Sequence, residues 1–108
     1  MENVKFEDFK KLNIRIAKIL KVEDHPNADK LYLVTVSTGE AEKTIVAGIK
    51  LHYKPEELTG KSVIIIDNLE PAVIRGVTSN GMLLAIKDGT SLAVLVPDRD
   101  IKIGSPVS

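Results

Sequence analysis

The chain has 108 residues, with 15 lysines and arginines balanced by 15 aspartates and glutamates, and it has no cysteine. This length suits one domain and leaves little room for two. Zero formal net charge argues against indiscriminate nucleic-acid binding, which relies on a strongly basic surface, so a basic site must be a local patch produced by folding. The absence of cysteine excludes a disulfide framework, a thiolate metal site and a cysteine nucleophile.

Signals for a membrane or for secretion are missing from the sequence. No apolar stretch reaches the roughly 20 residues that span a bilayer. The N-terminal segment MENVKFEDFKK contains acids and no apolar signal-peptide core. We therefore expect a cytoplasmic protein with no membrane partner.

The N-terminal segment predicts one or two helical turns. Phe6, Phe9 and Leu12 are spaced three residues apart and would share one helix face. We expect this helix to act as a plug, with its aromatic rings under a sheet.

A long strand is predicted next, over residues 14–22. Apolar and polar residues alternate along it, and a slip of phase around residues 17–19 predicts a β-bulge. Further strands are predicted over residues 30–37, 43–47, 62–66, 82–86 and 92–96, the last two joined by the hairpin signal Asp88-Gly89. Pro55 and the acids after it predict a short helix over residues 54–58.

Strands at spacings of roughly 8 to 15 residues, with only short helical pieces, predict a small closed or partly closed all-β barrel. The short helix between the third and fourth strands matches the five-stranded oligonucleotide-binding (OB) barrel. We expect a single domain, residues 1–108. In it, residues 1–88 form the barrel with its N-terminal helical turn, and residues 89–108 form an extension.

No catalytic site is visible in the sequence. His25 precedes a proline in a turn and His52 lies beside a tyrosine, and neither has the spacing of a metal site. The glycines form no phosphate-binding loop, and Ser79 lies in no G-x-S-x-G motif. We expect no enzymatic activity, no metal and no cofactor.

Four blocks of the sequence resemble those of one family. They are Asn13-Ile-Arg-Ile-Ala-Lys-Ile19, His25-Pro-Asn-Ala-Asp-Lys-Leu-Tyr32, Ile45-Val-Ala-Gly-Ile49, and the run from Asn68 to Met82 with the pattern N-L-x-P-x-x-x-R-G-x-x-S-x-G-M. In this order and spacing they resemble the tRNA-binding domain found at the C-terminus of many methionyl-tRNA synthetases, as free-standing dimeric tRNA-binding proteins, and in related synthetase cofactors. The resemblance implies an OB barrel that binds folded tRNA by shape rather than by sequence.

The resemblance also implies a set of RNA-contacting residues. Carried over by position, they are Lys30, Arg75, Ser79 and Met82, flanked by Asn68 and Asn80 as additional donors. Lys30 would supply a point charge to a phosphate, and Arg75 could fork onto two phosphate oxygens. Other readings stay open, because the two cations could be solvated, Ser79 could stabilise a turn and Met82 could belong to the core.

One departure from the family pattern lies beside this set. The family commonly has lysines where this chain has Glu70 and Val73, a change of about three charge units next to the predicted phosphate contacts. We therefore expect weaker and less salt-sensitive tRNA binding than in basic relatives. Gly76 and Gly81 would serve the backbone, through positive φ or close approach.

The same resemblance accounts for the extension, since it implies a two-fold homodimer built from the segment after the barrel. We expect the interface to contain Leu92, Val94, Val96, Pro97, Ile101 and Ile103. An apolar strand without a partner in its own barrel is an exposed edge unless another chain covers it. The alternative is that this tail folds back on its own barrel.

The sequence thus predicts non-catalytic tRNA binding, by a free-standing homodimer or by an accessory (beta) subunit of methionyl-tRNA synthetase. The expected partners are tRNA, a second copy of the chain and the catalytic subunit of the synthetase. The alternative is a protein-binding OB module with a chaperone-like or assembly role, favoured by zero net charge and Glu70.

Overall fold

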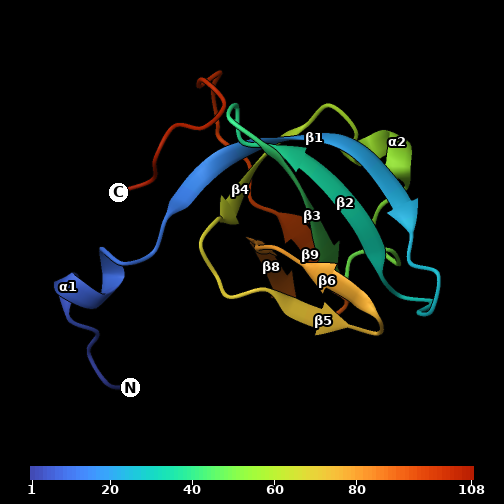
Figure 1. Ribbon diagram of the computed structural model, residues 1–108, viewed down its shortest axis with the longest axis horizontal. Helices are drawn as coiled ribbons and strands as arrows, with labels where there is room; N and C mark the ends of the chain where they lie inside the picture. The colour runs from blue at the N-terminus through green and yellow to red at the C-terminus, as the bar shows by residue number, and fades with distance from the viewer.

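Nine strands and two helical turns make up the chain, and the computed structural model describes all 108 residues (Figure 1). In chain order the elements are α1 (Phe6–Phe9), β1 (Ile14–Asp24), β2 (Tyr32–Ser37), β3 (Glu42–Ala47), α2 (Pro55–Leu58), β4 (Ser62–Ile66), β5 (Ala72–Ile74), β6 (Val77–Ser79), β7 (Met82–Leu83), β8 (Ala85–Asp88) and β9 (Ser91–Val94).

Strand β1 is shared by two halves of the barrel. Its residues 14–18 pair antiparallel with β4, and its residues 18–24 pair antiparallel with β2. The register shifts between Ile19 and Lys21, which confirms the β-bulge expected from the sequence. A bulge bends a strand and increases its twist, so one long strand can curve around the barrel.

The barrel closes between β3 and the segment that precedes β7. The main sheet has the order β3-β2-β1-β4-β7, which leaves β3 and β7 at its two ends. The amide of Asn80 donates to Thr44 O at 2.9 Å, and the amide of Val46 donates to Ser79 Oγ at 2.9 Å, so these bonds join the two ends. With α2 between β3 and β4, the predicted five-stranded OB-type barrel is confirmed.

Gly81 makes this closure possible. Its φ is +144°, and a Cβ built on it would lie 2.9 Å from Ile66 O and 3.4 Å from Ile45 Cδ1. No larger residue fits this approach without moving the backbone of β4. The expectation that Gly81 serves close approach is therefore confirmed.

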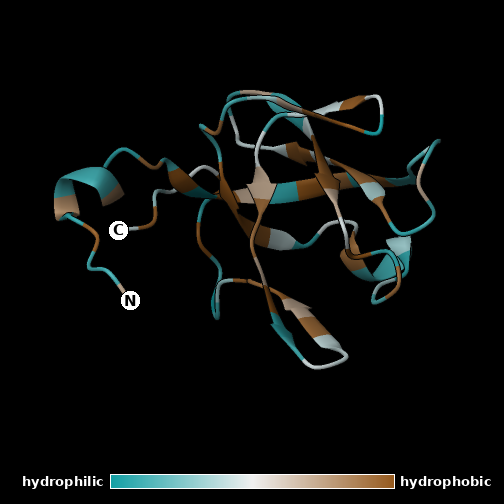
Figure 2. Cartoon of the chain, turned by 90° about the horizontal axis from the view of Figure 1, so that it is seen from below, coloured by the Kyte–Doolittle hydropathy of each residue, from teal (hydrophilic) through white to brown (hydrophobic).

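Aliphatic side chains fill the interior of the barrel. Burial alternates along β2, where Tyr32, Val34 and Val36 face inward, as a pleated strand requires. The fully buried side chains include Ile45 and Ile65 from strands on other sides of the barrel. Figure 2 shows hydrophobic colour concentrated in the barrel strands, while the loops are mostly pale or hydrophilic.

The N-terminal helix does not act as a plug, and that prediction is wrong. Helix α1 has no buried residue, and Phe6 is 71% exposed. The rings of Phe6 and Phe9 stack on each other with centroids 6.3 Å apart, and Lys10 Nζ lies 5.5 Å from the centroid of the Phe6 ring. The interior is already filled by aliphatic side chains, and α1 stands away from the barrel (Figure 1). No helix in the structure is both long enough and apolar enough to cross a membrane.

A second small sheet lies where the sequence pattern gives no strand prediction. Strands β5 and β6 pair antiparallel, with Ile74 opposite Val77, so Arg75 and Gly76 form a two-residue turn. The hairpin occupies most of the stretch between β4 and β7, and it projects below the main sheet in Figure 1.

Much of the tail folds back on its own barrel. Strand β9 pairs with β8, Asp88 opposite Ser91, so the expected boundary near residue 88 falls inside this hairpin. Val94 is buried in the core of its own barrel and Leu92 packs against that core. The side chain of Val94 is thus covered within its own chain, and its contact with a second copy stays a prediction.

Hydrogen bonds fix the tail in this position. The Tyr32 hydroxyl donates to Tyr53 O at 2.6 Å, and the Val94 amide donates to the Tyr53 hydroxyl at 3.1 Å, which connects β2 to β9. Burial raises the pKa of the Tyr32 hydroxyl above its ordinary value, and the Asp24 carboxylate raises it further. The Gly104 amide also donates to Ile16 O at 2.8 Å, so the last residues run beside the start of β1.

We expect Gly81→Ala to lower the free energy of unfolding by about 2 kcal/mol or more, since the added methyl group meets a backbone carbonyl and φ is unfavourable for alanine. The melting temperature should fall by roughly 8 °C for a domain of this size. Gly48→Ala is the matched control, because its Cβ would meet only Leu31 Cδ2 at 3.6 Å. Equal melting temperatures for the two variants would show that the close approach at Gly81 is not needed for closure.

Candidate nucleic-acid interface

The loop between β1 and β2 is hydrogen-bonded to the β5–β6 hairpin through His25. This histidine is only 5% exposed. Its Nδ1 accepts from the Asn27 amide at 2.9 Å, and its Nε2 lies 3.0 Å from Ile74 O. Because a carbonyl can only accept and Nδ1 is already an acceptor, Nε2 carries the proton and donates. His25 therefore has a structural role, since it links the loop to the hairpin.

Asn27 and Arg75 form a reciprocal pair at the tip of the hairpin. Asn27 Nδ2 donates to Arg75 O at 3.0 Å, and Arg75 Nη2 donates to Asn27 O at 3.1 Å. One residue of the loop therefore holds both the backbone and the guanidinium of Arg75. The two residues are 48 positions apart in the sequence.

The turn at the tip is strained at Arg75. Its φ is +52°, and it is the sole non-glycine residue of the chain with positive φ; Gly76 follows with φ +89°. Two successive residues of positive φ match a type I′ turn, where Asn-Gly is the favoured pair. Arginine in this conformation costs about 1 kcal/mol. The positive φ expected for Gly76 is confirmed.

Lys30 and Arg75 line one shallow depression of about 430 Å³, together with Ala28, Asp29 and Leu31. Both cations are exposed, so their charged groups are accessible to a ligand. The Asp29 carboxylate offsets part of their positive charge. The structure thus brings together the two basic residues that the family resemblance points to, although they come from opposite parts of the chain.

The two asparagines have other surroundings. Asn68 Oδ1 accepts from the Asn13 amide at 2.7 Å, and Asn68 Nδ2 donates to Lys11 O at 2.7 Å. Both ends of this amide therefore tie the N-terminal segment to the end of β4. Asn80 is half-buried beside the closure between β3 and β7. RNA contact by either residue stays a prediction.

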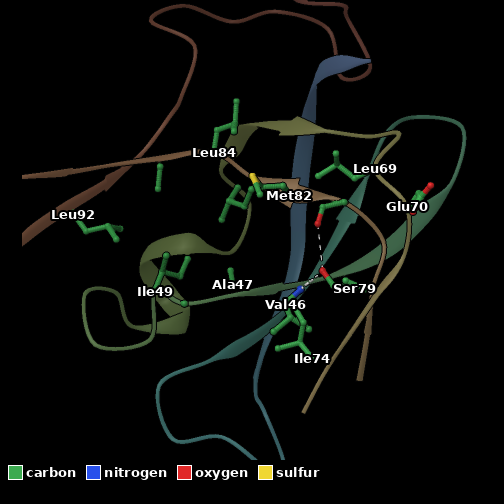
Figure 3. Close-up of a pocket in the computed structure, with 15 residues that line it drawn as sticks. Val46, Ala47, Ile49, Leu69, Glu70, Ile74, Ser79, Met82, Leu84 and Leu92 are labelled. Carbon is green, nitrogen blue, oxygen red and sulfur yellow. Dashed lines mark hydrogen bonds between the residues drawn. The ribbon is translucent and has the colours of Figure 1, made fainter. Parts of the chain in front are cut away.

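Ser79 is directed into the barrel. It is 4% exposed, accepts from the Val46 amide and donates to Gly81 O at 3.2 Å, as the dashed lines of Figure 3 show. These contacts fit the alternative interpretation, in which Ser79 stabilises a turn. Its predicted RNA contact stays a prediction that no contact in the structure supports.

Met82 lies at an apolar pocket separate from the depression of Lys30 and Arg75. This pocket has a volume of about 430 Å³, and eleven of its fifteen lining residues are hydrophobic, among them Ile49, Ile74 and Leu92 (Figure 3). Glu70 is its single charged lining residue. Met82 is exposed rather than core, so it can offer an apolar surface to a ligand.

Two further cations share one carboxylate within the barrel. Arg15 Nη1 lies 3.2 Å from Asp67 Oδ2, and Lys43 Nζ contacts the other oxygen of the same carboxylate. These side chains are mostly buried and already paired. The structure contains no group of three or more His, Asp or Glu side chains placed to hold a metal ion.

Comparison with known proteins identifies the family. The family model described as "Putative tRNA binding domain" matches residues 14–106. The chain belongs to this family. It is 59% identical over 107 residues to the methionine–tRNA ligase of Pyrococcus horikoshii, a match that covers 99% of the chain and 15% of the ligase. The chain thus spans about 15% of the length of this ligase.

Solved structures agree with the family. A methionyl-tRNA synthetase (MetRS) related protein from Pyrococcus horikoshii superposes with a TM-score of 0.92 at 31% identity, covering 100% of both chains. The chaperone CsaA of Bacillus anthracis superposes with a TM-score of 0.88 at 26% identity, covering 99% of this chain and 100% of CsaA. The resemblance to the tRNA-binding domain of methionyl-tRNA synthetases is confirmed.

His25 and Asn27 are missing from the site residues that the sequence indicates. The turn that contains them is visible in the sequence, as is its match to the family. Their contacts with Ile74 and Arg75, however, depend on a hairpin that the pattern did not predict.

We expect Ser79→Ala to lower the free energy of unfolding by about 1–3 kcal/mol, because the Val46 amide loses its acceptor. Urea denaturation measures this change, with the exposed Ser91→Ala as the matched control. A Ser79→Ala protein as stable as the control would contradict the structural role. Loss of tRNA affinity at unchanged stability would instead support the RNA contact.

Proposed function

We propose that the chain binds tRNA without catalysing a reaction, through a surface that includes Lys30 and Arg75. The observation that carries the proposal is the shared depression of these two exposed cations in a member of a tRNA-binding family. Met82 and Asn80 extend the proposed surface toward the closure of the barrel. Folded RNA presents phosphates and 2′-hydroxyls over a wide surface, so a few well-placed donors can recognise its shape.

With only Lys30 and Arg75 in the depression and a net charge of zero for the chain, we expect a weak complex with tRNA. Glu70 and Val73 stand where the family resemblance implies lysines, and Asp29 lies in the depression itself. Weak binding is useful where a protein raises the concentration of tRNA near a second enzyme. We therefore propose a role beside methionyl-tRNA synthetase, as a free-standing protein or as an accessory subunit.

We expect Arg75→Ala to weaken tRNA binding by about tenfold and Lys30→Ala by about threefold, because arginine can fork onto a phosphate and lysine cannot. Gel shifts with unfractionated tRNA at low salt measure this. Lys87→Ala, an exposed lysine on the β8–β9 hairpin, should bind like the wild type. Failure of the wild type to bind at low salt would refute the proposed function.

The salt dependence of binding provides a second measure. Each phosphate contact contributes up to about 0.9 to the slope of log affinity against log salt. With few basic residues at the surface, we expect a slope no steeper than about four, reduced by nearly one in Arg75→Ala. A steeper slope in filter binding would mean that more cations contact the RNA than Lys30 and Arg75 allow.

We also propose that the chain is a homodimer. The tail keeps exposed apolar side chains after its return to the barrel, with Val96 50% and Ile101 44% exposed. Pro97 and Ile103 are half-buried beside them. A second copy related by two-fold symmetry would cover this segment and offer tRNA two binding surfaces.

We expect light scattering at micromolar concentration to give twice the mass of the chain. Val96→Glu and Ile101→Glu should give the monomer mass with little change in melting temperature, since both side chains are exposed. Val73→Glu places the same charge on the exposed β5 strand and should remain dimeric. A monomeric wild type would refute the dimer.

A second candidate function is binding to protein. It is favoured by the apolar pocket around Met82 and by the similarity to CsaA, which is described as a chaperone. If the wild type does not bind tRNA at low salt, this function becomes the leading candidate.

A further inference from the structure

Arg75, at the tip of the β5–β6 hairpin, is an unusual residue for the backbone conformation found there. Arg75 has a φ of +52°, where asparagine or glycine would be relaxed. Strain of this kind persists where the surroundings impose it, and it is concentrated at functional sites. The surroundings that impose it here come from a loop 48 residues earlier in the chain.

We propose that His25 and Asn27 are positioning residues, which fix the turn and the guanidinium of Arg75 before a phosphate arrives. The proposal rests on the tRNA-binding function proposed above, and it adds two residues that the family resemblance does not assign. His25 holds the hairpin through Ile74 O at 3.0 Å and holds the loop through the Asn27 amide at 2.9 Å. Because both of its nitrogens are occupied and it is buried, His25 acts without touching RNA.

Asn27 acts on the side chain and the backbone of Arg75 together. Its side-chain Nδ2 donates to Arg75 O at 3.0 Å, and its backbone carbonyl accepts from Arg75 Nη2 at 3.1 Å. Arginine has five N–H donors, so one internal bond leaves the others available to a phosphate. An arginine ordered in advance loses less side-chain freedom on binding, which strengthens the complex without adding a contact.

The first test uses the free protein, so its result does not depend on tRNA binding. Asn27→Ala removes the Nδ2 bond that fixes the Arg75 backbone and keeps the backbone carbonyl that accepts from Arg75 Nη2. Nitrogen-15 relaxation of the Arg75 Nε–H group should therefore show restricted motion in the wild type and increased motion in Asn27→Ala, because the turn that aims the guanidinium is no longer fixed. Thr59→Ala is the matched control, because it removes a comparable side-chain bond, to Pro55 O at 2.8 Å, in another loop. A mobile Arg75 side chain in the wild type would overturn the proposal whether or not the protein binds tRNA.

The second test is a double-mutant cycle on tRNA affinity. Asn27→Ala should weaken binding about fivefold when Arg75 is present, and it should leave the affinity of Arg75→Ala unchanged. Equal weakening in both backgrounds would overturn the proposal, because Asn27 would then act independently of Arg75. If Thr59→Ala weakens binding as much as Asn27→Ala, the effect is general destabilisation and the proposal also fails.

Discussion

The closure of the barrel at residues 79–81 is the constraint on which the rest of the structure depends. A β-sheet ends in unpaired amides and carbonyls, and a closed barrel removes those edges. Here the closure uses the Ser79 hydroxyl, the Asn80 amide and the missing side chain of Gly81. Strands β5 and β6 come immediately before this point, so the position of their hairpin is fixed by it.

Two surfaces of different chemistry follow from this arrangement. One side of the β5–β6 hairpin ends at Arg75 and meets the β1–β2 loop, which makes the small charged depression. The strands of the same hairpin supply Ala72, Ile74 and Ser79 to the apolar pocket. A single hairpin therefore separates a site suited to phosphate from a site suited to apolar groups, within one short segment of chain.

Local sequence patterns predicted much of the fold. Alternation and its phase slip predicted β1 with its bulge, Pro55 predicted the start of α2, and the run at 62–66 predicted β4, because each depends on neighbouring residues. The plug role of α1 failed because burial of Phe6 depends on space that the rest of the barrel had filled.

The site was predicted less completely than the fold, because several of its contacts join distant parts of the sequence. The family resemblance placed Lys30 and Arg75, and the structure brings them together. The resemblance could not reveal that the Ser79 hydroxyl accepts a hydrogen bond from the Val46 amide, or that Val94 is buried in the core of its own chain. These contacts join residues far apart in the sequence, so no local spacing encodes them.

The pairing of Arg15 and Lys43 with Asp67 affects the rates at which a polyanion associates and dissociates. With these two cations already paired and a net charge of zero, there is little long-range attraction to draw RNA in. Encounter rates then fall toward the unsteered range of about 10⁵–10⁶ M⁻¹s⁻¹. For the proposed complex with tRNA, an ordinary encounter rate combined with few contacts gives a short lifetime, which suits delivery of tRNA to a second enzyme rather than its storage.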